Sequence, residues 1–283
     1  MKYTFGVLCT LLCTHAFTQV QVDTTEPKAV IDSIFIASVE IPNPDKVLHA
    51  EPLFIDLIRD LGARKGEREW NMGVGITDKT NFDAYTMLVE YEWAPINRLG
   101  FEVELPFTIY PGRSVNKPGS QLNSLKLASQ YTFFVQKQAA VSMAFGYIHE
   151  FLLPTFKNYG KAKTLRGHVH NPFLILAKRW GQNWHSLLYT GPIIENEYGN
   201  KHSQWQLNSN VHYMIRGTRN FVGLEINQSF TVREAQTVLR PQIRVGVADN
   251  LLIGIVAGIP IQKNQERLSQ FIRLIYEPTH RRH

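Results

Sequence analysis

The feature that most constrains this chain is a pair of alternating runs between residues 84 and 108. Apolar side chains occupy every second position in both runs, and a short polar segment, Pro95–Arg98, separates them. Period-two alternation on both sides of such a turn predicts a β-hairpin. The apolar positions are Tyr85, Met87, Val89, Tyr91 and Trp93, then Leu99, Phe101, Val103, Leu105 and Phe107.

The opposite face of this hairpin carries four carboxylates, at Glu90, Glu92, Glu102 and Glu104. A soluble β-sandwich rarely turns four carboxylates toward its core, whereas a membrane barrel with a polar lumen does so routinely. Pairing about the turn places Glu90 and Glu102 nearly opposite each other, where like charges are destabilising unless cations intervene. The hairpin therefore predicts a transmembrane β-barrel.

Alternating segments recur from Glu69 to Tyr276 and give about twelve strands, with roughly ten to fourteen as the range left open. Short turns tend to alternate with longer loops, as in outer-membrane barrels. The fold class is thus all-β: an antiparallel transmembrane barrel of about twelve strands, with a soluble β-sandwich or lipocalin-like barrel as the structural alternative. The longer loops are expected at residues 109–121, 151–167, 195–203 and 229–238.

The N-terminus has the pattern of a secretory signal peptide, residues 1–18, with Lys2 before an apolar core. Both cysteines, Cys9 and Cys13, lie inside it, so a processed chain would have neither disulfides nor thiolate metal sites. The net charge of +6 is modest, and no nucleic-acid-binding motif accompanies it. We therefore expect an exported protein of the outer membrane of a Gram-negative bacterium, without nucleic acid as a partner.

Residues 19–66 are predicted to form an N-terminal periplasmic or plug segment, followed by the barrel over 67–283. Pro52 suits the first position of a helix and Gly62 the position just after its end, which predicts a short amphipathic helix near residues 51–61. The helix could pack on or inside the barrel end, dock a periplasmic protein or act as a mobile plug. Its apolar face would consist of Leu53, Phe54, Leu57, Ile58 and Leu61.

The stretch His49–Asp56, HAEPLFID, resembles the motif that names the HAEPLYID family of exported bacterial proteins, with Phe54 in place of the family's tyrosine. The following residues, LIRDLGARKGEREW, are similar to that family as well. The resemblance implies a cell-envelope protein and no established chemistry. The C-terminal part is more loosely similar to outer-membrane transporter barrels of the phenol-degradation type.

If the apolar series face lipid, the alternate series face the lumen. We expect the lumen to contain Glu90, Glu92, Glu102, Glu104, Lys126, His212, Arg244 and Arg273. Arg244, Arg273 and Lys126 stand on other strands than the glutamates and could reach across to neutralise them. The same residues fit either an ion-pair network that fills a narrow lumen or a charge-lined passage for small polar solutes.

Catalytic and metal sites find little support in the sequence. There is no Gly-x-Ser-x-Gly motif, and the adjacent pairs His185–Ser186 and His202–Ser203 would point to opposite faces of a strand. His168 and His170 could present two imidazoles on one face of a strand. Because no third ligand is evident, a polar pair at a strand start is the preferred interpretation, and we expect no catalytic residue, metal or cofactor.

The leading functional expectation is porin-like or transporter-like passage or binding of small polar solutes without catalysis. The main alternative is a structural or interaction barrel with a packed lumen, whose N-terminal helix docks a periplasmic partner. A barrel-embedded lipid-modifying enzyme is a further alternative. Outer-membrane lipid and the barrel-assembly machinery are expected as partners in each case.

Overall fold

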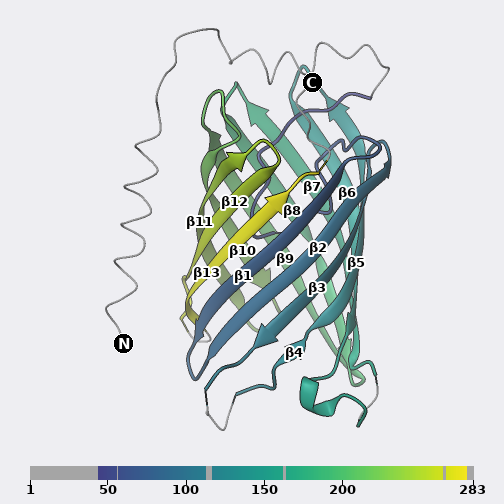
Figure 1. Cartoon of the computed structure of the whole chain (residues 1–283), viewed down its shortest axis with the longest axis vertical. Helices are drawn as coiled ribbons and strands as arrows, with labels where there is room; N and C mark the ends of the chain where they lie inside the picture. The colour runs from purple at the N-terminus through teal and green to yellow at the C-terminus, as the bar shows by residue number, and fades with distance from the viewer. Residues whose placement is uncertain (1–43, 56, 113–116, 162–163, 264–265, 279–283) are drawn as a thin grey trace. The chain divides into compact units, whose positions relative to one another are not determined.

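The structure is a computed structural model that describes residues 44–55, 57–112, 117–161, 164–263 and 266–278. The predicted signal peptide, 1–18, lies outside the described residues, as do residues 19–43. The described part of the chain forms one antiparallel β-barrel with an irregular segment in its interior (Figure 1).

Twelve long strands and one two-residue strand, β4, follow one another along the chain. Their bounds are β1 Arg68–Lys79, β2 Asp83–Ile96, β3 Leu99–Ile109, β4 Gln121–Leu122, β5 Ser124–Gln136, β6 Val141–Leu152, β7 Gly167–Trp180, β8 Trp184–Glu197, β9 Asn200–Met214, β10 Phe221–Phe230, β11 Ala235–Ala248, β12 Leu251–Pro260 and β13 Glu266–Tyr276.

The sheet is closed. Each long strand pairs with its neighbours in sequence, β1 pairs with β13, and β2 pairs with both β1 and β3. Closure leaves no edge strand whose backbone groups would lack partners in lipid. The predicted all-β barrel and its strand number are therefore confirmed. Among the described residues, no helix is long and apolar enough to cross a membrane.

The opening hairpin forms β2 and β3, but its register differs from the sequence-based expectation. Glu90 pairs with Glu104 and Glu92 with Glu102, because the ladder is irregular between Trp93 and Ile96, next to the turn. Two pairs of carboxylates thus stand directly opposite each other. Glu90 and Glu102, expected to face each other, lie on a diagonal.

Two of the four expected long loops are shorter than predicted. β8 and β9 extend to Glu197 and Asn200 around a tight turn, and β10 and β11 are separated only by residues 231–234. Next to the turn, both strand pairs carry polar side chains on both faces of the sheet. The alternation of apolar and polar residues that marks a strand is therefore hidden in the sequence. The other two loops, between β3 and β5 and between β6 and β7, are long as expected, and the latter holds a short 3₁₀ helix, Phe156–Asn158.

The two ends of the barrel differ. At one end, which we call the short-turn end, β1 begins, β13 ends and the connections are short; at the loop end lie the long connections β3–β5 and β6–β7 (Figure 1). The outer wall between them carries large exposed apolar side chains such as Val74, Leu174 and Ile272. Aromatic residues gather toward the ends, for example Trp70 beside Tyr91, with ring centroids 4.6 Å apart.

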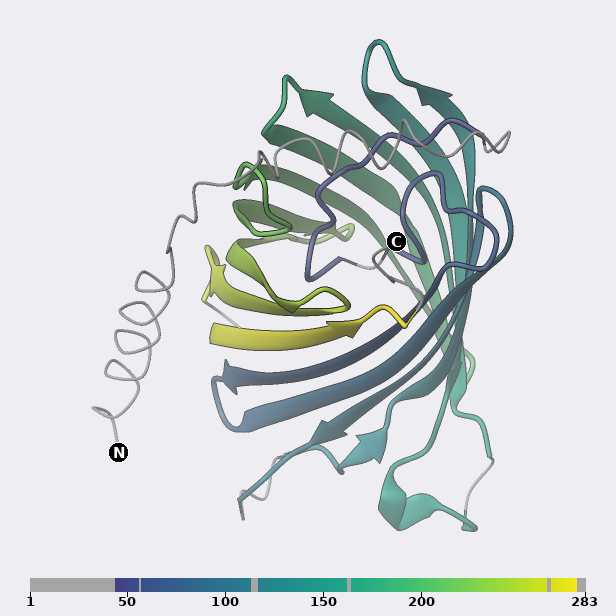
Figure 2. The same cartoon turned by 45° about the horizontal axis from the view of Figure 1, so that its top comes forward.

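Residues 44–66, which we call the inner segment, run inside the ring of strands near the short-turn end (Figure 2). The predicted helix near 51–61 is wrong: the described residues there adopt bends and turns. The physical reason is that side chains of the barrel wall, rather than carbonyls one turn earlier, accept the backbone N–H groups of this segment. Asp56 lies outside the described residues.

Candidate functional site

One side of the inner segment packs against an apolar wall. Ile55, Leu57, Ile58 and Leu61 join one buried cluster with side chains of β5 to β8. The wall contributes Ala128, Ala144, Ile148, Phe173, Ile175, Ala177, Leu187 and Tyr189. Burial of each large apolar side chain of the segment stabilises docking by about 1.5–3 kcal/mol. This contact makes the segment an integral part of the barrel interior.

A second apolar cluster holds the first part of the segment. Ala50 and Leu53 are buried with Phe221, Leu252, Val256 and Ile275. Gly254 permits the close approach, because a Cβ at this position would lie only 2.6 Å from Cδ2 of Leu53. The apolar residues of the segment thus contact different parts of the wall.

Polar side chains of the wall bind the backbone of the inner segment. The N–H of Ala50 donates to Nδ1 of His185 at 2.9 Å, and the N–H of Leu53 donates to Oε1 of Gln242 at 2.8 Å. The N–H of Gly62 donates to Oγ1 of Thr132 at 2.9 Å. These bonds satisfy buried donors that a helix would otherwise satisfy internally.

Glu225 on β10 is the main acceptor for the motif. Its carboxylate accepts the N–H groups of Phe54 at 3.4 Å and Ile55 at 3.0 Å. It also accepts hydrogen bonds from the amides of Asn227 at 2.6 Å and Gln242 at 3.1 Å. Glu225 is fully buried, so its removal would leave several donors without an acceptor.

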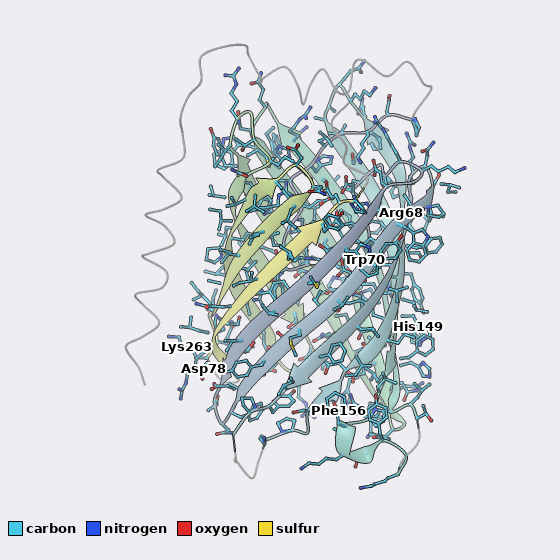
Figure 3. All side chains as sticks on the ribbon, viewed as in Figure 1. Arg68, Trp70, Asp78, His149, Phe156 and Lys263 are labelled. Carbon is cyan, nitrogen blue, oxygen red and sulfur yellow. The ribbon has the colours of Figure 1, made fainter. Side chains whose placement is uncertain are left out.

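The opposite wall, on β1, β2, β3 and β13, is charged. Arg59 of the inner segment donates through Nη1 to Glu69 at 2.8 Å and to Glu92 at 3.3 Å. Arg273 binds Glu90 at 2.6 Å. Figure 3 shows many nitrogen- and oxygen-bearing side chains gathered at this end of the barrel. The segment therefore supplies one of the cations that the carboxylates of the hairpin require.

Lys126 on β5 completes the cation set of this wall. It lies 3.2 Å from Glu102 and binds Glu104 as well. Glu90, Glu92 and Glu102 each bring one carboxylate oxygen within 4.8 Å of the others, a spacing at which a hard divalent cation could be held. Positive side chains of the protein already approach all three carboxylates.

All eight sequence-derived lumen residues are buried inside the barrel, but they do not form one group. Glu90, Glu92, Glu102, Glu104, Lys126 and Arg273 lie together in the charged wall.

His212 and Arg244 lie elsewhere. His212 packs edge-on against Phe221 with ring centroids 4.5 Å apart, and Arg244 lies over the same ring. Arg244 donates to the carbonyl oxygen of Arg219 rather than to the glutamates of the hairpin.

A serine–histidine pair that spans two distant segments was missed by the sequence analysis. Nε2 of His49 lies 2.9 Å from Oγ of Ser142. Burial lowers the pKa of His49 to about 3, and the nearby His185 and the Arg179 guanidinium add to this effect. Nδ1 of His49 has no hydrogen-bond partner among the described residues, so the third member of a catalytic triad is not present in this part of the chain. The pair anchors the segment.

A cavity of about 560 Å³, which we call the vestibule, lies between the inner segment and the loop end. Phe54 and Ile55 reach it from the segment, and Phe54 is the exposed member of the predicted apolar set. Amide side chains are the most numerous polar groups in its lining: Asn171, Gln204, Gln206, Asn208, Asn227, Gln228, Gln236 and Gln262.

Some of these amides are already oriented by neighbours. Oδ1 of Asn171 accepts from Gln206 at 2.8 Å and from the hydroxyl of Tyr189 at 3.2 Å. Asn227 bridges Asn208 and Glu225, so the vestibule and the inner segment share one hydrogen-bond network.

Comparison with known proteins identifies the family and the type of barrel. A family model described as HAEPLYID-like matches residues 45–277, which include the inner segment and the barrel. No curated protein matches the chain by sequence.

Several solved outer-membrane barrels have a similar fold. The COG4313 outer membrane channel from Pseudomonas putida F1 has a TM-score of 0.59 at 11% identity, over 79% of this chain and 99% of that one. The NanC porin has a TM-score of 0.52 at 9% identity, and the KdgM porin 0.51 at 11%; each likeness covers 74% of this chain and 98% of the porin. At these identities the likeness establishes a porin-like fold.

Proposed function

Because the chain belongs to the HAEPLYID-like family and folds as a porin-like barrel, we propose that it is a channel for small polar solutes that its own inner segment closes. The observation that carries this proposal is the division of the lumen. The inner segment packs against opposite walls near the short-turn end, whereas a cavity of about 560 Å³ remains at the loop end.

The proposed location is the outer membrane of a Gram-negative bacterium. The closed sheet and its exposed apolar outer wall suit a barrel in lipid. Short turns face the periplasm in such barrels and longer loops face outward. The inner segment would then close the periplasmic end, and solutes would enter the vestibule from outside.

The vestibule lining supports a polar solute. An amide side chain offers two donors and an acceptor, which suits the hydroxyl and amide groups of a polar solute. Tyr189 adds a hydroxyl, and charged side chains of both signs stand among the amides: Lys79, Lys126, Glu150, Glu234, Arg240 and Glu266. We assign the barrel no catalytic step, since neither His49 nor Ser142 of its serine–histidine pair lines the vestibule.

Electrical conductance of the purified full-length protein in planar bilayers tests the proposal. Replacing Leu53 and Ile58 together with serine removes two apolar anchors from the segment and leaves the barrel wall unchanged. We expect rare, brief openings for the natural protein and sustained current for the L53S/I58S variant. Liposome swelling with neutral sugars should rise in parallel.

Leu48→Ser is the matched control, because Leu48 is an exposed leucine of the same segment. It should behave as the natural protein does. If L53S/I58S inserts as a heat-modifiable barrel and carries no current, the pore proposal is wrong, and a packed interaction barrel is the better account.

A further inference from the structure

Three histidines meet on the outer surface of the barrel. His168 and His170 lie two residues apart on β7 and therefore share one face of the strand. His149 on β6 pairs directly with His170 in the antiparallel register. All three side chains are partly exposed, and Figure 3 shows His149 outside the barrel wall. The third imidazole comes from another strand, so local spacing could not reveal it.

The geometry points to a transition-metal site at His149, His168 and His170, independent of the channel. Nε2 of His149 and Nδ1 of His168 lie 3.1 Å apart. Two nitrogens that bind one tetrahedral zinc ion at about 2.0–2.1 Å each are separated by about 3.3 Å. Small side-chain movements would let these two nitrogens bind one metal ion. The ion would replace the hydrogen that now lies between them.

His170 supplies the third ligand. Its ring centroid is 4.6 Å from that of His149 and 6.4 Å from that of His168. Nδ1 of His170 lies 2.5 Å from the hydroxyl of Tyr147. This contact orients the ring, and a metal-binding histidine commonly uses its second nitrogen in such a contact. Nδ1 is engaged in this contact, so Nε2 of His170 is the nitrogen left to bind a metal.

The surroundings of the three histidines favour a metal ion of intermediate softness that reaches the site from water. Imidazole ligands suit Zn²⁺, Cu²⁺ and Ni²⁺, whereas Mg²⁺ and Ca²⁺ prefer oxygen. Phe151 stacks on His149 with ring centroids 4.3 Å apart and holds it in place. On β7 the exposed apolar residues Leu174 and Leu176 lie farther from the loop end, so the histidines stand at the border of the apolar band, where water reaches them.

Isothermal titration of the purified, untagged barrel with Zn²⁺ tests this site. His280 and His283 near the C-terminus are replaced by glutamine in every version, so that the tail does not contribute. We expect one Zn²⁺ per chain with a micromolar dissociation constant. His149→Gln and His168→Gln should each weaken binding at least tenfold, and electron paramagnetic resonance of bound Cu²⁺ should show three nitrogen ligands.

His202→Gln is the control, because His202 is an exposed histidine of β9 away from this group. It should leave binding unchanged. All variants should keep the heat-dependent gel shift of a folded barrel, since the altered histidines of the strands are all at least partly exposed. No binding at millimolar Zn²⁺, or equal binding by natural protein and the H149Q/H168Q variant, would overturn the inference.

Discussion

The interior of the barrel is filled on one side of Phe54 and hollow on the other. Toward the short-turn end, the inner segment packs against apolar residues of β5 to β8 and places Arg59 on the carboxylates of β1 and β2. Toward the loop end, the walls carry amides around a cavity. The lumen of the twelve-stranded barrel therefore has a filled half and a hollow half. The position of the inner segment determines which half is filled.

The difference has a chemical basis in the wall residues. The filled half offers apolar surface together with charges that need partners, and the segment supplies matching groups for both. The hollow half offers amides and charged side chains around a cavity, and several of the amides bond one another. The comparison predicts that changes in the filled half affect closure, whereas changes in the vestibule affect the solute.

The largest effect is expected for Arg59→Leu. This change leaves Glu69 and Glu92 without their cation from the segment, and loss of one partner from a buried ion pair typically costs about 3–5 kcal/mol. Hydrogen exchange of residues 50–62 should report opening of the segment with a barrel that stays protected. Arg68→Leu removes an exposed arginine at the start of β1 and serves as control. Equal protection in both variants would argue against the role of Arg59.

A smaller effect is expected for Glu225→Ala. The N–H groups of Phe54 and Ile55 lose their acceptor, and buried donors without partners should weaken docking by about 2–3 kcal/mol. Asn208→Ala changes the same network from the vestibule side and should change docking by less than about 1 kcal/mol. Hydrogen exchange separates the two variants. If both open the segment to the same extent, the division into a closing half and a solute-binding half is wrong.

The smallest effect is a pH dependence that arises from His49. Its pKa of about 3 in the docked segment is below the ordinary value of 6.5, so the released segment binds more protons between these values. Docking is therefore strongest above pH 6.5 and weakens as the pH falls toward 3. At pH 5.5 the loss relative to pH 7.5 should be about 1.4 kcal/mol. In His49→Gln this part of the pH dependence of hydrogen exchange should vanish; an unchanged slope would exclude His49 as its source.

The barrel itself could be predicted from the sequence, because alternation along Tyr85 to Phe107 directly encodes which face meets lipid. The form of the inner segment could not. Leu53, Leu57, Ile58 and Leu61 recur at helical spacing, but they contact two different clusters of the wall. Glu225 and Gln242 bind the backbone there, and no local pattern shows such distant acceptors.

The same limit applies to the charges. The inward positions of Glu90 and Arg273 follow from alternation, and their contact follows from strand order once the barrel closes. The contact of Arg59 with Glu92 depends on where an irregular segment lies, which periodicity does not encode. The vestibule depends on that position too, since Phe54 and Ile55 form part of its lining.

A reversible lock on the inner segment tests the central claim most directly. A Cβ at Gly254 would lie 3.2 Å from Cγ of Leu53. In Leu53→Cys the cysteine sulfur takes the place of this Cγ. The double variant Leu53→Cys with Gly254→Cys therefore fits disulfide geometry. Cys9 and Cys13 lie in the predicted signal peptide. The engineered pair would therefore supply the only two thiols of the processed chain. The pair is placed in the Arg59→Leu background, in which docking is weakened. We predict no current from the oxidised protein in a planar bilayer and sustained current after addition of a reductant; equal current before and after reduction would contradict closure by the inner segment.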